Sequence, residues 1–268
     1  MEFRTLDKAQ NKPKNEQALA CVIYPEVAAS ALKAKVHAAY AVFVVVKVYD
    51  SHRGGSGLVS NNELVEIAQK TLGVSRSQAY RVISSGVGVF WREPRHKTVG
   101  LFSHLRVYYN LGIEMFSSKP VRLTVAQIGY DSDNYSGSYI KDLMVSCVAS
   151  WDSGGSAIAV ETIAELTGVS TRTVRRQIKY MSCRPNGIVL DVSTCYKVKC
   201  DNINQIEANA RVQQLNSNGM VKYHSAPKDG QYAILERVGN IYNLAGVERL
   251  GRKRRHRHLK HVSNWRRD

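Results

Sequence analysis

Two stretches of the chain place arginine, glutamine and hydroxyl side chains directly after the same tripeptide, Gly-Val-Ser. The two tripeptides are residues 73–75 and 168–170. In a helix that begins at each serine, the polar side chains of the first turns point away from the apolar positions that face a core. Arginine can donate two hydrogen bonds to a guanine edge, and glutamine can pair with an adenine edge. We therefore expect sequence preference for DNA from six residues: Arg76, Gln78, Arg81, Arg172, Thr173 and Arg176.

The elements that must position the second set are predicted by residues 163–179. An amphipathic run forms a short first helix, and Gly168 tolerates the positive φ that ends it and starts a sharp turn. Ser170 then stands where an N-cap residue belongs. Val174 and Ile178 are four residues apart, so they share the inner face of the second helix.

The first set lies in a second copy of this pattern, residues 67–83. It has the same Ile-Ala pair, the same turn, and the apolar residues Ala79 and Ile83 at the same spacing, with one extra residue before the glycine. Ser75 takes the place of the N-cap residue. The copies are about ninety-five residues apart, which is longer than a solenoid repeat and indicates two domains of one type.

Each copy is similar to a helix-turn-helix, whose second helix enters the major groove of DNA. On these two segments the chain resembles tandem winged-helix DNA-binding proteins. In size, charge and duplicated layout it is most like the initiators of plasmid and phage replication. The resemblance implies an α+β, mostly helical fold with two winged-helix domains, each a helix-turn-helix followed by a β-hairpin wing. It also implies a sequence-specific, non-enzymatic protein that needs no cofactor.

Other interpretations use the same residues. A transcription regulator of a mobile element needs only operator binding, and a DNA-coating or partition protein would also be basic and duplicated. For either segment taken alone, an ordinary helix pair with a solvated basic face is the alternative.

Changes in composition divide the chain into five parts. Serine and proline are frequent around residue 118, which indicates a linker there. The parts are a flexible N-terminal arm (1–16), a first winged-helix domain (17–116), the linker (117–122), a second winged-helix domain (123–248) and a basic C-terminal tail (249–268).

In the first domain we expect a short helix within residues 17–29, interrupted by Pro25, and then a long buried helix over residues 31–49. The β-branched residues near its end leave a strand as the alternative. Residues 51–60 are rich in glycine and serine and predict a loop. Asn61 or its neighbour Asn62 is expected to cap the helix that follows.

A hairpin is expected after the first helix-turn-helix, with strands at residues 87–91 and 98–101. Its tip is basic, as a wing that lies on phosphates should be; a solvated turn is the alternative. Residues 103–110 should form a closing helix or strand. The tip residues expected to contact phosphate are Arg92, Arg95 and Lys97, with His96 beside them.

The second domain should repeat this order with additions. A helix over residues 139–152 mirrors the long helix of the first domain. The last hairpin is either the wing of this domain or an addition to it. The later elements are expected at residues 188–192 and 196–199 (strands), 202–216 (helix), and 221–224 with 231–236 (a hairpin).

The formal net charge is +16 and the pI is about 9.7. This excess favours a polyanionic partner, here double-stranded DNA, with the replication or transcription machinery as a further expected partner. The most apolar stretch, residues 36–49, is too short to cross a bilayer and contains Lys47, and the polar N-terminus does not look like a signal peptide. Five cysteines without close spacing indicate reduced thiols. We expect a monomer or homodimer in the cytoplasm, associated with the nucleoid, or in the nucleus if the host is eukaryotic.

DNA contacts are expected from both second helices, from the wing and from the tail. The tail is dense in charge and poor in apolar residues, so it should not fold alone, and it suits phosphates or a minor groove. A solvated tail is the alternative. The expected DNA-binding residues are Ser75, Arg76, Ser77, Gln78, Arg81, Arg92, Arg95, Lys97, Ser170, Thr171, Arg172, Thr173, Arg175, Arg176, Lys179, Arg252, Lys253, Arg254, Arg255 and Arg257.

No group of residues predicts catalysis. His256 and His258 resemble the histidine pair of rolling-circle nickases, but they flank the charged Arg257 where that family has an apolar residue. Tyr108 and Tyr109 could act as nucleophiles, although adjacent aromatic residues usually belong to a core. No metal site is expected, because the cysteines lack the close spacing of zinc ligands.

Overall fold

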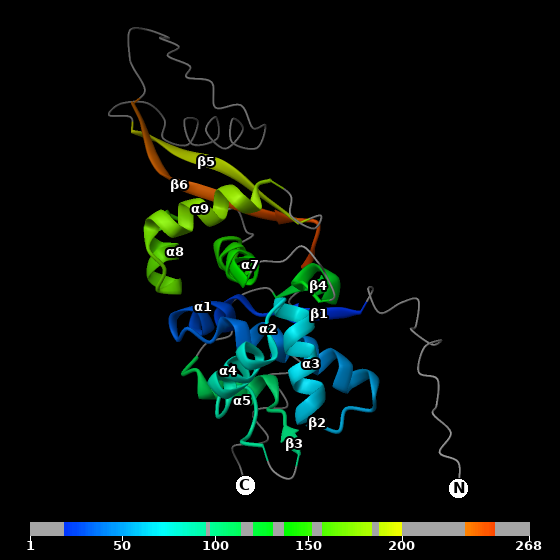
Figure 1. Cartoon of the computed structure of the whole chain (residues 1–268). Helices are drawn as coiled ribbons and strands as arrows, with labels where there is room; N and C mark the ends of the chain where they lie inside the picture. Colours follow the sequence, from blue (N-terminus) through cyan, green and yellow to red (C-terminus); the bar gives the residue numbers. More distant parts are fainter. Residues whose placement is uncertain are drawn as a thin grey trace, which may run out of the picture.

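The computed structural model describes residues 19–94, 97–113, 120–130, 137–151, 157–183, 188–199 and 234–249. Within them the fold is mixed α+β and mostly helical, with small antiparallel sheets (Figure 1). We refer to residues 19–113 as the first unit and to residues 120–249 as the second unit.

The first unit begins with a strand and two helices, and its helix-turn-helix segment follows a short second strand. The elements are β1 (Ala20–Ile23), α1 (Pro25–Lys33), α2 (His37–His52), β2 (Leu58–Ser60), α3 (Asn61–Leu72), α4 (Arg76–Gly86), β3 (Thr98–Gly100) and α5 (His104–Asn110).

The second unit has a similar order and ends in a longer hairpin. Its elements are β4 (Val121–Thr124), α6 (Val125–Ile128), α7 (Gly137–Ala149), α8 (Val160–Thr167), α9 (Thr171–Met181), β5 (Val189–Lys199), β6 (Ile234–Ala245) and β7 (Glu248–Arg249).

Both units place the same strand pattern beside the helix pair. In the first unit β2 pairs with β3 in antiparallel fashion, and Leu101 just after β3 bridges back to Trp91. In the second unit Ile158, just before α8, bridges Asn240 of β6, and β6 pairs with β5. In both units a hairpin follows the helix pair. The segment just before the helix pair contacts the second arm of that hairpin. The duplication therefore extends beyond the helices to the strands.

A three-stranded sheet joins the units, in the order β1, β4, β7. β1 and β4 run antiparallel, with Cys21 opposite Leu123. Val121 and Arg122, which the sequence placed in the linker, lie in β4 instead. The strand partner of β4 is 102 residues away in the chain, so local composition could not reveal it.

Helices of both units pack together in the interior. Between Ala39 and Val46 no side chain of α2 is more than 2% exposed, which confirms that this segment is a buried helix. α7 contacts both α1 and α2, and α1 also contacts α8 (Figure 1). Buried residues of the two units form one hydrophobic cluster. This shared core sets where one helix pair lies relative to the other.

Several expected boundaries in the first unit are wrong. Residues 20–23 form a strand, and Pro25 begins α1 instead of interrupting a helix, because a first-turn residue needs no N–H partner. The helix expected over residues 31–49 is broken after Lys33, where Lys35 adopts a left-handed φ of 60°. The cap of α3 is Ser60, whose hydroxyl accepts a hydrogen bond from the Glu63 amide at 3.2 Å.

The hairpins also differ from expectation. The first arm of the first hairpin is short, because residues 88–90 form a turn and only the backbone around Trp91 pairs with Gly100 and Phe102. The two strands expected at residues 188–192 and 196–199 are one strand, β5, with an irregularity at Cys195. The expected helix at residues 202–216 and the turn at residues 225–230 lie outside the described residues.

Candidate nucleic-acid interface

The turns of the two helix pairs have the same backbone conformation. Gly73 and Gly168 end the first helices with left-handed φ values of 61° and 65°. The Ser75 hydroxyl accepts a hydrogen bond from the Gln78 amide at 3.4 Å, and the Ser170 hydroxyl accepts one from the Thr173 amide at 3.3 Å. These caps confirm where α4 and α9 begin, so the first turns of both helices carry the expected polar residues.

The inner faces of the two second helices are buried as expected. Ala79 and Val174 have no exposed surface, and Ile83 and Ile178 pack one turn later. α4 and α9 are the same length, and both copies keep these apolar positions 95 residues apart. The outward residues can therefore be compared position by position.

Most of the expected DNA-binding residues are at the surface. Thr171 and Thr173 are half-buried, and the others that the structure describes are exposed. The exposed set is Ser75, Arg76, Ser77, Gln78, Arg81, Arg92, Lys97, Ser170, Arg172, Arg175, Arg176 and Lys179. Arg95 and the tail residues Arg252, Lys253, Arg254, Arg255 and Arg257 lie outside the described residues.

Some of these side chains already have local partners. The Gln78 carboxamide oxygen accepts hydrogen bonds from the Ser75 amide at 3.1 Å and from the Ser75 hydroxyl at 3.2 Å, which completes a capping box. The Thr173 and Ser170 hydroxyls are 2.9 Å apart and share a hydrogen bond. Arg175 forms an exposed ion pair with Glu161 of α8 at 3.2 Å. These residues position the helices as well as facing solvent.

Arg76 is held more loosely. Its guanidinium lies 3.4 Å from the Tyr80 hydroxyl and near the face of that ring. By contrast, the side chains of Arg81, Arg172 and Lys179 make no hydrogen bond or ion pair with any residue that the structure describes. Their charges are the most available to a ligand.

Arg81 and Arg176 occupy the same position of α4 and α9, 95 residues apart. The next residue differs: Val82 in α4 and Gln177 in α9. Gln177, which the sequence placed on an outward face, is only 1% exposed. Its side chain turns inward and hydrogen-bonds Asp142 of α7, a carboxylate that is itself buried.

Asp142 is a functional candidate that the sequence did not single out. Burial raises the pKa of its carboxyl, while the hydrogen bond from Gln177 and the charges of Arg176 and Lys141 act in the opposite direction. The Asp142 carboxyl therefore lies in the packing of α7 against α9, where the charge of Arg176 acts on it. A lone acid within the apolar helix α7 was the signal that could have identified it.

The first hairpin is fixed to its helix pair by Trp91, which is fully buried. The Trp91 indole nitrogen donates a hydrogen bond to the Ile83 carbonyl of α4 at 3.0 Å. Gly86, at the end of α4, lies so close to the ring that an added Cβ would be 2.4 Å from it. On the other arm, the Lys97 carbonyl accepts a hydrogen bond from the Asn61 amide at 2.8 Å. The backbone segments that carry Arg92 and Lys97 are thus held against α4 and α3.

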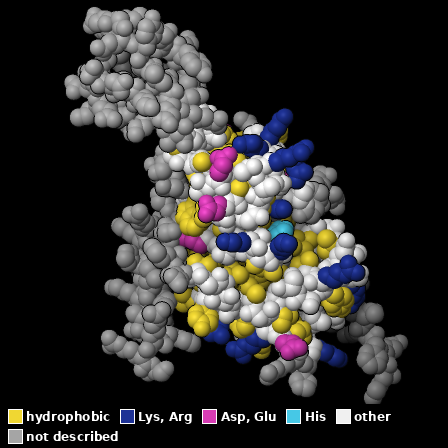
Figure 2. Space-filling model, turned by 90° about the vertical axis from the view of Figure 1, so that its left-hand side faces the viewer, with side chains coloured by type: hydrophobic (Ala, Val, Ile, Leu, Met, Phe, Trp, Pro, Cys, Tyr) yellow, Lys and Arg dark blue, Asp and Glu magenta, His cyan; other side chains and the backbone are white. Residues whose placement is uncertain are grey.

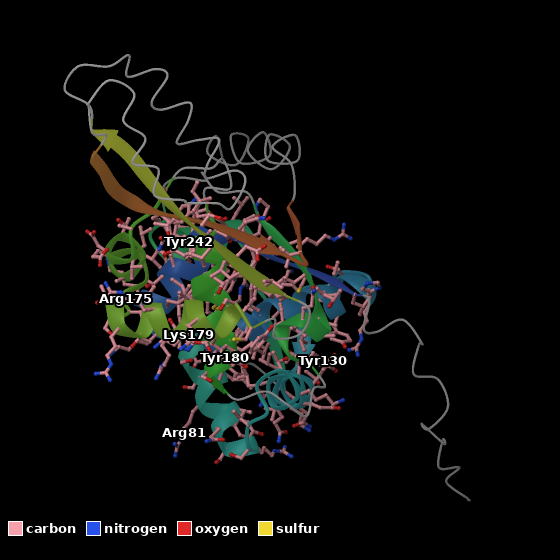
Figure 3. All side chains as sticks on the ribbon, turned by 90° about the horizontal axis from the view of Figure 1, so that it is seen from above. Arg81, Tyr130, Arg175, Lys179, Tyr180 and Tyr242 are labelled. Atoms are coloured by element: carbon pink, nitrogen blue, oxygen red, sulfur yellow. The ribbon has the colours of Figure 1, made fainter. Side chains whose placement is uncertain are left out.

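Several basic side chains lie on the face of the molecule that Figure 2 draws. These Lys and Arg side chains lie at several heights, from the upper right through the middle to the lower edge, and one histidine lies among them at mid-height. In Figure 3, Arg81 of α4 and Arg175 and Lys179 of α9 lie on the left-hand side of the view, away from Tyr130. In this view the labelled basic side chains of α4 and α9 therefore lie toward the same side.

Comparison with known proteins gives no relatives: no family model, no curated protein and no solved structure matches this chain. Among the described residues no group of three or more His, Cys, Asp or Glu side chains is placed to hold a metal ion. None of the helices in the described ranges is both long and apolar enough to cross a membrane.

Proposed function

We propose that this protein is a sequence-specific double-stranded DNA-binding protein with two winged-helix units, in which α4 and α9 are the recognition helices. The observation that carries the proposal is the duplication. Two capped helices of equal length follow equivalent glycine turns, and each exposes arginine at its first turns beside a hairpin. A net charge of +16 supports a polyanionic ligand.

The side-chain partners assign roles within this proposal. Arg81, Arg172 and Arg176 are the best readers of bases, because their guanidinium groups extend from the exposed face and can reach two guanine acceptors. Gln78, Thr173 and Arg175 have local hydrogen-bond partners, so they hold the helices in the groove and read bases only through their remaining donors. Arg92 and Lys97 of the wing contact phosphates.

The two units in one chain make the second contact intramolecular. Once one recognition helix is bound, the other is held near its own site, which raises the overall affinity without a new contact. One chain therefore reads two adjacent sites, and a dimer is not required for this purpose.

Selection from a random duplex library, followed by measurements on Arg81→Ala and Arg176→Ala, tests the proposal. Each substitution should weaken binding to the selected site about 5- to 150-fold, the equivalent of 1–3 kcal/mol per two-bond contact, and should affect scrambled DNA little. Arg106→Ala is the matched control, because that arginine lies over the Tyr109 ring of α5, at 5.0 Å. No enrichment of any sequence, or equal losses on selected and scrambled DNA, would refute base reading and favour a coating protein.

For the biological role we propose initiation of plasmid or phage replication, on the basis of the duplicated layout and basic charge. A transcription regulator of a mobile element would use the same residues. The location of the selected sequence separates the two: repeated copies at a replication origin support initiation, and overlap with a promoter supports regulation.

A further inference from the structure

A cluster of basic side chains lies where the two units meet, apart from either recognition helix. It consists of Lys33 and Lys35 at the end of α1, His37 at the start of α2, and Lys141 of α7. We name these four residues the junction cluster. Nothing in the sequence indicated it, because its members come from three elements and from both units.

The turn of the second helix pair rests directly on this cluster. A Cβ added to Gly168 would lie 3.3 Å from the Lys33 Cα and 3.4 Å from its Cγ. Lys33 therefore lies beside the turn that leads into α9. Lys33 and Lys35 are both exposed, and Lys35 holds its left-handed conformation in the tight turn between α1 and α2.

Helix packing brings the remaining members into the same region, because α7, which carries Lys141, packs against α1, α2 and α9. The pKa of the His37 imidazole is lowered, first by burial and then by the charge of Lys141. Lys141 and Arg176 both act on the Asp142 carboxyl. Lys141 therefore lies on a helix that packs against α9, the helix that carries the proposed base-reading Arg176.

The cluster has three lysines, and the acids near it in the fold are Asp142 of α7 and Glu165, three residues before Gly168. The charges of Lys141 and Arg176 act on the carboxyl of Asp142, which is buried. Lys33, Lys35 and Lys141 make no ion pair with any residue in the described part of the chain. The Nδ1 atom of His37 is buried and also has no hydrogen-bond partner there. An anion at this place would find several unused positive charges.

We infer that the junction cluster is a third DNA contact, in which Lys33, Lys35 and Lys141 bind the phosphates that flank the minor groove between the two major-groove sites. This rests on the proposed function. When two helices read successive major grooves from one side, the intervening minor groove faces the protein between them. The cluster occupies the corresponding place, where the unit that carries α4 meets the unit that carries α9.

The contact adds affinity without adding sequence preference, since phosphates are the same at every base pair. It also determines how far apart the two sites can be. A duplex with extra base pairs between them moves its phosphates away from the junction cluster, so the lysines favour one spacing.

The test compares two triple variants of the full chain by binding to duplex DNA at several salt concentrations. The junction variant is Lys33→Ala, Lys35→Asn and Lys141→Ala, with asparagine chosen because it tolerates a left-handed φ. The control variant, Arg53→Ala, Lys70→Ala and Arg106→Ala, removes the same charge from residues with local partners: Glu63, Glu66 and the Tyr109 ring.

Three phosphate contacts contribute about 2.7 to the slope of log affinity against log salt, at about 0.9 each. Between 50 and 200 mM salt the affinity of the wild-type chain should therefore fall about 40-fold further than that of the junction variant. The control variant should keep nearly the wild-type slope. The junction variant should lose affinity equally for selected and scrambled duplexes, and should lose its preference for one spacing. The His37 resonance should titrate at a higher pH in the wild-type complex than in the free protein, because a nearby phosphate favours the charged imidazole.

Equal slopes for the two variants would overturn the inference, because the effect would then reflect net charge alone. A wild-type slope in the junction variant, together with an unchanged His37 titration, would also overturn it, even if the Arg81 and Arg176 variants lose their selected site. If the wild-type chain binds no duplex DNA, the proposed function itself fails. The circular dichroism spectrum and urea midpoint of each variant show whether it is folded.

Discussion

Gly168 offers a direct test of how the two units are joined. The residue adopts a φ of +65°, and an alanine Cβ there would lie 3.3 Å from the Cα of Lys33. Gly112, after α5, has almost the same conformation, with a φ of +66°, but an added Cβ would meet nothing within 4 Å. Gly168→Ala and Gly112→Ala therefore carry the same free-energy cost of a left-handed backbone. They differ because only the new Cβ at residue 168 meets another residue, Lys33.

The shared cost is small. A non-glycine residue in the left-handed region costs about 1–2 kcal/mol. Alanine recovers about 0.4–1 kcal/mol of this by restricting the unfolded chain. Gly112→Ala should therefore lower the free energy of unfolding by about 1 kcal/mol. At Gly168 the new methyl group also presses on a backbone atom, which cannot rotate away, and this adds about 1–3 kcal/mol of overpacking.

Urea unfolding followed by circular dichroism measures both variants. With a slope of about 2 kcal/mol/M, the midpoint of Gly168→Ala should lie about 0.5–1.5 M below that of Gly112→Ala. Equal midpoints would show that the turn of the second helix pair does not rest on α1. Lys33 would then not lie beside the turn that leads into α9, and the proposed DNA contact of the junction cluster would be refuted.

Two further predictions concern the packing of α9. Val174→Ala should lower the free energy of unfolding by about 2 kcal/mol, because a fully buried side chain leaves a cavity, whereas Val192→Ala, at a residue 41% exposed, should have little effect on the urea midpoint. The stability advantage of wild type over Asp142→Asn should shrink as pH rises. Burial raises the folded-state pKa of Asp142, so its contribution to stability is present below the unfolded value of about 3.9 and is lost as pH rises through the folded value. Urea midpoints measured between pH 4 and pH 7 follow this difference, and a difference that grew with pH would contradict the account.

The helix pairs could be predicted because their signals are local. A glycine that ends one helix, a serine that caps the next and two apolar residues four apart all act within about a dozen residues. The structure confirms each of these features at Gly168, Ser170, Val174 and Ile178. The first copy could be predicted in the same way, because it has the same glycine, serine cap and apolar spacing.

The features that the sequence did not reveal depend on distant partners. Residues 20–23 form a strand because β4 lies beside them, and Val121 leaves the expected linker for the same reason. Gln177 is polar, yet it is buried because Asp142 of another helix accepts its hydrogen bond. Exposure of the candidate site could be predicted from helical periodicity, whereas the partners of its side chains could not.

The pairing of β1 with β4 bears on how the proposed sites are arranged. The two strands hold equivalent places at the start of their units, and they run antiparallel. Units related by simple translation would place these strands parallel, whereas a two-fold rotation places them antiparallel. Under the proposed function, the recognition helices therefore approach the duplex in opposite senses, as in a dimer on a palindrome.

The side chains do not share this symmetry. The first turn of α4 carries Arg76 and Ser77 where the first turn of α9 carries Thr171 and Arg172, while the position of Arg81 is arginine in both helices. The two half-sites should thus share the base pair read by that common arginine and differ at the others. A symmetric backbone with unequal side chains binds an asymmetric site in one orientation only, which a symmetric homodimer cannot do. Under the proposed function, a duplicated single chain suits a role in which the direction along the DNA matters, and this holds for the start of replication and for the start of transcription.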